Sequence, residues 1–149
     1  MYEILKHAHS GFRYLVLLLL VVALLQALNG WLGNKNYTEG NRKINLFTLI
    51  SAHLQLVIGL ALYFIGGWFK VDTADKAMRY WKMEHISMMI IAIILITIGN
   101  SKSKKVQEAV AKHKTIAIFF GIALIIIIGS IFMMTKNVPG RTFFGSSAS

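Results

Sequence analysis

Four apolar stretches separated by polar segments dominate the pattern along the chain. The apolar runs cover residues 14–28, 44–69, 86–99 and 115–134. A helix needs about 20 mostly apolar residues to cross the hydrocarbon core of a bilayer. Extending the two shorter runs, the third toward its N-terminal side, predicts spans at about 10–30, 44–69, 80–99 and 115–134. Residues 136–149 are expected to form a flexible tail after one transmembrane domain, residues 1–135.

This pattern predicts an all-α integral membrane protein built as an antiparallel four-transmembrane-helix bundle. In lipid, a helix satisfies its own backbone hydrogen bonds, and short connections favour antiparallel neighbours. The chain's single proline lies in the expected tail, so it interrupts none of the predicted helices. A cleaved signal peptide is the alternative for the first run, but Gln26, Ala27 and Leu28 form a poor cleavage site.

The composition is typical of a membrane protein and excludes several kinds of cofactor and metal site. Of 149 residues, 56% are hydrophobic and 15% are charged, yet the formal net charge is +10. The basic residues lie between the apolar runs, which argues against a soluble nucleic-acid-binding domain with a basic face. The chain has no cysteine. This excludes haem attached through C-x-x-C-H, cysteine-ligated iron–sulfur clusters and thiolate zinc sites.

The distribution of lysine and arginine bears on orientation in the membrane. Four spans place both termini on one side, and each side carries eight of these residues near the span ends. The dense basic cluster within residues 102–114 favours the cytoplasm for its side. We therefore predict a multi-pass protein of the bacterial inner membrane with both termini in the periplasm. The basic clusters are expected to contact lipid headgroups rather than nucleic acid.

The five histidines carry the main functional signal, because ionisable residues inside a span are costly to keep there. His85 enters the membrane when the third span is completed, and His9 lies at or just within the membrane edge on the same side. His53 is nine residues into the second run, or about 14 Å of helix rise, which places it near the midplane. His113 is expected at the opposite interface, and His7 cannot share the helical face of His9.

Two imidazoles at similar depth on different helices are the ligands that a haem bound between helices needs. His9 and His85 meet this condition, so we predict that they bind the iron of a haem b. Arg13 lies one turn from His9 and can pair with a propionate, while Gly11 would let the macrocycle approach the backbone. His53 and His113 form a candidate second pair, although helix rise leaves them about 10 Å or more apart in depth. One haem is expected, and two are the alternative.

Other interpretations of these residues stay open. His53 can hydrogen-bond across helices, and His113 can be an interfacial residue. Soft ligands such as Met83, Met88 and Met89 beside His85 can select copper(I), although methionine is also a packing residue. Gln26 and Gln55 can bind a quinone or bond between helices.

Three segments resemble consecutive helices of a haem A synthase half. These are HSGFRYLVLLL from His9, LQLVIGLALYF from Leu54, which contains a Gln-x-x-x-Gly pattern, and HISMMIIAIIL from His85. The resemblance implies that His9 and His85 hold haem on the outer side of the membrane. The chain has one such half rather than two, and lacks a glutamate at the usual spacing before the first histidine. The order of histidines is also similar to di-haem transmembrane b-type cytochromes, which implies the pairs His9 with His85 and His53 with His113.

The sequence thus favours a small bacterial membrane cytochrome b that transfers electrons in or beside a respiratory chain. Its expected partners are membrane lipids and a quinol or a respiratory-complex subunit, in a homo- or hetero-oligomer. The alternatives are a non-redox accessory subunit of a larger membrane complex and a membrane protein that handles copper or haem. The residues do not decide whether the protein is an enzyme.

Overall fold

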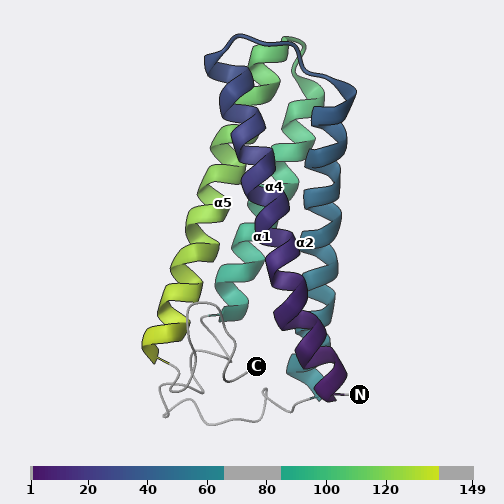
Figure 1. Ribbon diagram of the computed structural model, residues 1–149, viewed down its shortest axis with the longest axis vertical. Helices are drawn as coiled ribbons and strands as arrows, with labels where there is room; N and C mark the ends of the chain where they lie inside the picture. The colour runs from purple at the N-terminus through teal and green to yellow at the C-terminus, as the bar shows by residue number, and fades with distance from the viewer. Residues whose placement is uncertain (1, 66–84, 138–149) are drawn as a thin grey trace.

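The computed structural model describes residues 2–65 and 85–137, and this part of the chain folds into four helices (Figure 1). The helices are α1 (Tyr2–Leu32), α2 (Glu39–Ile65), α4 (His85–Lys105) and α5 (Ala109–Asn137). All four are long and apolar enough to cross a membrane. The predicted all-α bundle of four spans is therefore confirmed. Parts of these expectations lie outside the described residues: the end of the second span at 66–69, the start of the third at 80–84 and the tail at 138–149. Residues 136 and 137, expected in the tail, belong to α5.

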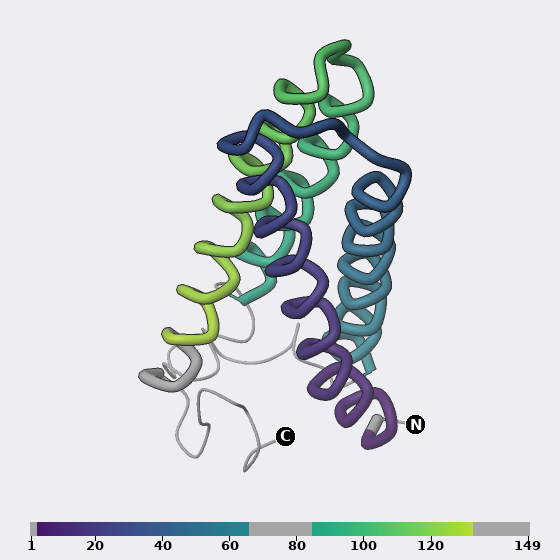
Figure 2. The backbone as a smooth tube through the Cα atoms, turned by 45° about the horizontal axis from the view of Figure 1, so that its top comes forward, coloured from purple at the N-terminus to yellow at the C-terminus, as the bar shows by residue number. Residues whose placement is uncertain are grey.

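The helices alternate in direction around the bundle (Figures 1 and 2). Helix α1 packs against α2 and α5, and α4 packs closely against α5 but along a shorter stretch against α2. The connections 33–38 and 106–108 lie together at one end, which we call the linker end. The chain's N-terminus lies at the opposite end, which we call the N-terminal end (Figure 1).

In α1 and α5, buried residues recur at alternating intervals of three and four positions. Hydropathy does not show this spacing, because most other positions of these helices are apolar too. In α5 the buried positions include 113, 116, 120, 123, 127 and 130, and in α1 they include 16, 20, 23, 27 and 30. This 3.5-residue period is the one that keeps a seam of one helix facing its neighbours in a left-handed bundle. Many buried positions are small, such as Ala23, Ala27, Gly99 and Ala123. Small residues let membrane helices approach closely, since lipid supplies no hydrophobic force between them.

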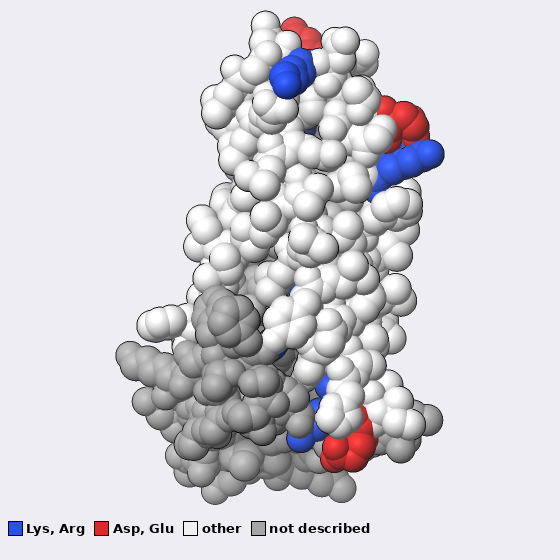
Figure 3. Space-filling model, in the orientation of Figure 1, with Lys and Arg blue, Asp and Glu red and all other residues white. Residues whose placement is uncertain are grey.

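Large apolar side chains cover the outside instead. Leu18 and Leu25 of α1, Val57 of α2 and Ile125 of α5 are all at least 60% exposed. On the face shown in Figure 3, charged residues gather near the two ends and leave a broad, almost uncharged band between them. A helix that is apolar all round is typical of a membrane span. This explains why hydropathy predicts the spans without showing which face of each helix is internal.

The link between α1 and α2 is fixed by local hydrogen bonds. Asn34 has a positive φ of 54°, and the amide of Lys35 donates to the carbonyl of Gly30 at 2.9 Å, as expected at a helix C-terminus. Thr38 then caps α2, because its hydroxyl accepts from the amide of Asn41 at 3.1 Å. Helices α1 and α5 begin earlier than the expected spans, at Tyr2 and Ala109, because a helix need not end at the bilayer surface.

Candidate functional site

The structure brings together the two histidines that the sequence predicts as haem ligands. His9 of α1 and His85 of α4 are both half-buried near the N-terminal end. Their ring centres are 6.3 Å apart, and the ring planes cross at 83°. Seventy-six positions separate these residues in the chain. Their meeting follows from the up-down order of the helices, which sets the starts of α1 and α4 at the same end.

This spacing fits two imidazoles bound to one metal ion from opposite sides. A metal–imidazole bond is about 2 Å long, and each nitrogen lies about 1 Å from its ring centre, so the two centres would be about 6 Å apart. Nearly perpendicular planes are compatible with such a pair, since each ring can turn about its own bond to the metal. The distance between the ring centres therefore fits two imidazole ligands of one iron, as a b-type haem needs.

Helix α2 supports His9 with two residues one turn apart. The side-chain amide of Gln55 donates a hydrogen bond of 2.8 Å to the backbone carbonyl of His9. Gly59 lies against the imidazole, since a Cβ placed there would be 3.1 Å from Cε1 of His9. The Gln-x-x-x-Gly spacing puts both residues on one face of α2, so Gln55 holds the backbone of His9 and Gly59 leaves room for its ring. Of the two interpretations of Gln55, the structure shows the bond between helices.

The two other residues expected near a haem are placed differently. Gly11 is exposed, and a Cβ there would meet no atom within 4 Å, so the glycine that approaches His9 is Gly59 rather than Gly11. The sequence contains Gly59 within the Gln-x-x-x-Gly pattern, but nothing in the chain shows that it faces α1. Arg13 is half-buried one turn above His9. Its guanidinium donates to the hydroxyl of Tyr14 at 3.2 Å and lies over the Tyr14 ring.

His53 lies on the outside of the bundle. It is exposed on α2, and its Nε2 is 3.0 Å from the hydroxyl oxygen of Thr97 on α4. The expected hydrogen bond between helices is therefore present, and the imidazole borders the groove between α2 and α4.

His113 is buried near the start of α5, at the linker end. Its Nε2 donates to the backbone carbonyl of Asn36 at 2.9 Å, and its ring meets the edge of Tyr37. The ring also fills the space beside Gly30, where an added Cβ would overlap it. His113 thus fastens the α1–α2 connection to α5. His53 and His113 have separate partners, and the structure does not pair them.

The remaining candidates are Met83, Met88, Met89 and Gln26, of which Met88 is half-buried. Met89 packs on the core cluster, and Met83 lies outside the described residues. Within residues 2–65 and 85–137, no three His, Cys, Asp or Glu side chains come close enough to hold a metal ion. A haem makes smaller demands on the chain, because the porphyrin supplies four nitrogens and the protein only the axial ligands. Gln26 is half-buried, and its side-chain oxygen is buried without a hydrogen bond from any described residue.

Comparison with known proteins gives no match: no protein-family model, no curated protein and no solved structure is similar to this chain. The functional argument therefore stands on the residues and their geometry.

Proposed function

We propose that this chain is a membrane-embedded b-type haem protein that transfers electrons, with His9 and His85 as the axial ligands. The observation that carries the proposal is the 6.3 Å separation of the two imidazole centres, on helices far apart in the sequence. When bound, the haem supplies one-electron redox chemistry. Two imidazole ligands would occupy both axial positions, which favours electron transfer over substrate chemistry at the metal.

The surrounding residues have distinct parts in this proposal. Gln55 fixes the backbone of His9, and Gly59 leaves space for the His9 ring. Arg13 is close enough in the chain to turn from Tyr14 toward a propionate, since positions 9 and 13 share a helix face. Both imidazoles are half-buried between helices, and burial is one of the properties that tune a haem potential.

The separate partners of His53 and His113 favour one haem in each chain rather than two. His113 would have to release the carbonyl of Asn36 before its Nε2 could bind iron. His53 would have to leave Thr97.

The test is haem binding by the purified full-length chain expressed with sufficient haem. A reduced-minus-oxidised spectrum should show b-type absorbance with about one haem per chain. His85→Ala and His9→Ala should each abolish it or reduce it at least tenfold. The matched control is His7→Ala, because His7 is exposed and two residues from His9 but on another helical face.

Three outcomes would contradict the proposal. The first is wild-type protein without haem absorbance. The second is loss of haem in His7→Ala with retention in His85→Ala. The third is stoichiometric copper in the purified protein without haem, which would favour a copper-handling role. Circular dichroism of each variant checks that the bundle has formed, so that loss of haem is not loss of the fold.

A further inference from the structure

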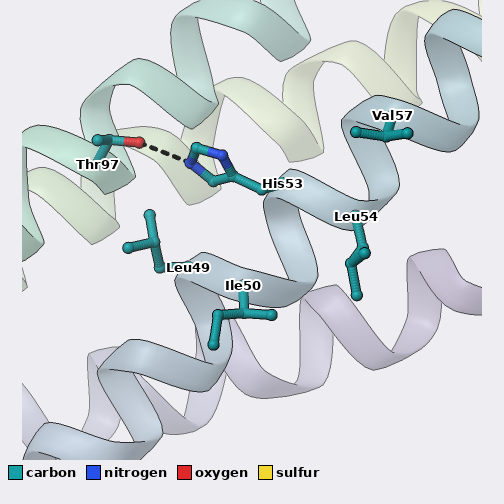
Figure 4. Close-up of a pocket in the computed structure, with 6 residues that line it drawn as sticks. All are labelled: Leu49, Ile50, His53, Leu54, Val57 and Thr97. Carbon is teal, nitrogen blue, oxygen red and sulfur yellow. Dashed lines mark hydrogen bonds between the residues drawn. The ribbon is translucent and has the colours of Figure 1, made fainter.

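A groove on the outer surface of the bundle, midway along α2, has mainly apolar walls and contains the polar imidazole of His53. It has a cavity volume of about 370 Å³ and lies between α2 and α4 (Figure 4). Its walls are Leu49, Ile50, His53, Leu54, Val57 and Thr97. Ile50, Leu54 and Val57 are exposed on the outside of the bundle, so in a membrane the groove opens toward the lipid. A ligand would reach it through the bilayer rather than from water.

The hydrogen bonds of Thr97 determine which nitrogen of His53 carries the proton. A threonine hydroxyl has one hydrogen to donate, and that of Thr97 lies 2.7 Å from the carbonyl oxygen of Ile93, an acceptor only. The Thr97 oxygen must then accept from Nε2 of His53, at 3.0 Å. In the neutral imidazole, Nδ1 is therefore the unprotonated nitrogen and a hydrogen-bond acceptor. Figure 4 shows it on the side of the ring away from Thr97.

This acceptor has no partner among the residues that the structure describes. A polar group left without a hydrogen bond in hydrocarbon is costly, so a donor that reaches it from the lipid would be favoured. Such a donor must be apolar enough to dissolve in the bilayer and flat enough to lie between Leu49, Leu54 and Val57. It must also carry a hydroxyl group. A lipid-soluble quinol meets all three conditions, whereas the oxidised quinone has carbonyl oxygens and no hydroxyl to donate.

We propose that this groove binds the head group of a membrane quinol, with a quinol hydroxyl donating to Nδ1 of His53. The groove lies on the two helices that also contact or carry the imidazole pair. His53 precedes Gly59 by six residues of α2, or about 9 Å of helix rise, and Thr97 follows His85 by twelve residues of α4, or about 18 Å. Any redox role for the bound quinol rests on the proposed haem, but the binding itself does not.

The test compares binding of a short-chain naphthoquinol and of its oxidised quinone to the full-length protein in lipid nanodiscs, under anaerobic conditions. Retention above that of empty nanodiscs measures binding apart from partition into lipid. One hydrogen bond should make the quinol bind roughly five- to tenfold more tightly than the quinone. His53→Leu should remove this preference and most of the binding, and His7→Leu, at an exposed position outside the groove, should leave both unchanged.

Thr97→Val tests the hydrogen-bond argument without removing the histidine. Valine has nearly the shape of threonine but cannot accept from Nε2, so the imidazole proton becomes free to move to Nδ1. The preference for quinol over quinone should then fall toward unity while the groove keeps its shape. Thr97→Val also tests the proposal if the His53→Leu protein fails to fold.

Equal binding of quinol and quinone by the wild type, or undiminished binding by His53→Leu, would overturn the proposal. So would a dimer or complex of the wild type that His53→Leu disrupts, because the groove would then be a protein interface. A chain that binds quinol through His53 but binds no haem would contradict only the proposed function. A chain that binds haem but no quinol through His53 would contradict only this site.

Discussion

At the scale of single residues, the contacts of the histidines indicate different roles, which the sequence alone does not distinguish. His9 and His85 face each other, His53 donates to Thr97 at the surface, and His113 holds a backbone carbonyl in the interior. His7 is exposed and lies 4.0 Å from Glu3 on the same helix. The imidazole is the same in every case. The role of each imidazole depends on which ring nitrogen already has a hydrogen bond and on which group faces the other nitrogen.

Gly59 provides a residue-scale test of the imidazole pair. A Cβ at this position would lie 3.1 Å from Cε1 of His9, and a longer side chain would push the ring out of place. Overpacking of this kind costs about 1–3 kcal/mol, so Gly59→Leu should weaken haem retention roughly tenfold or more. Haem transfer to apomyoglobin measures the effect.

The matched control is Gly129→Leu. Gly129 lies in α5, where an added Cβ would meet nothing within 4 Å. The Gly129→Leu variant should retain haem as well as the wild type does. Normal retention in Gly59→Leu would show that α2 does not constrain His9.

At the scale of the helices, small residues and internal hydrogen bonds accompany the large apolar contacts of the core. Helix α2 turns a polar row inward, where Asn45 donates to the Tyr37 hydroxyl at 2.8 Å. In the same row, Thr48 donates to the carbonyl of Ile44 at 2.8 Å, and Ser51 donates to that of Thr48 at 3.0 Å. Polar groups buried between membrane helices need such partners. In α2 the large apolar side chains, such as Phe47, Ile50 and Leu54, therefore face outward, opposite to a helix of a soluble bundle.

The contact between α4 and α5 can be tested at Gly99. A Cβ on Gly99 would lie 2.6 Å from Cβ of Phe119, which belongs to the neighbouring helix. Because neither Cβ can move without its backbone, Gly99→Ala must push the helices apart. The overpacking cost of about 1–3 kcal/mol should exceed the gain of about 1 kcal/mol from the better helix former.

Unfolding in sodium dodecyl sulfate, followed by circular dichroism, should therefore begin at a lower detergent fraction for Gly99→Ala than for the wild type. Gly129→Ala, which meets no neighbour, should unfold at the same or a higher fraction. Unchanged or increased stability of Gly99→Ala would show that α4 and α5 can separate at little cost.

At the scale of the whole molecule, the linker end brings basic and aromatic side chains together. The linker end carries eight basic residues against two acidic ones, Glu39 and Glu108. The basic residues are Lys35, Arg42, Lys43, Lys102, Lys104, Lys105, Lys112 and Lys114. Lys102, Lys112 and Lys114 lie over the rings of Phe119, Tyr37 and Trp31, respectively. Aromatic rings and long cationic side chains together are typical of a membrane–water interface. The imidazole pair lies at the other end.

Orientation can be tested directly, because the chain has no cysteine of its own. Gln107→Cys places a thiol in the exposed connection at the linker end, and His7→Cys places one at the exposed N-terminal end. A membrane-impermeant maleimide added to intact bacterial cells should label His7→Cys at once. It should reach Gln107→Cys only after the inner membrane is permeabilised.

The opposite labelling pattern would reverse the predicted orientation and place the imidazole pair on the cytoplasmic side. Labelling of both variants from the same side would contradict a bundle that crosses the membrane with these two ends on opposite faces.

The number of helices and their membrane character could be predicted from the sequence alone, which also indicates the histidines as candidate site residues. Long apolar runs permit few structures in lipid, because only an element that satisfies its own backbone can cross. The depth of His9 and His85 followed from helix rise and the length of a span. Gln55 and Gly59 were visible as a pattern, but their contact with His9 was not.

Only the tertiary structure decided which faces are internal and which residues meet. The inner and outer faces of α1 and α5 are both mainly apolar, so hydropathy contains little signal for the seam of these two helices. The contact of His9 with Gly59 and of His53 with Thr97 depends on the rotation of each helix about its own axis. That rotation is set by the small residues at positions such as 23, 27, 99 and 123, because close approach of two backbones is possible only along the line where side chains are small.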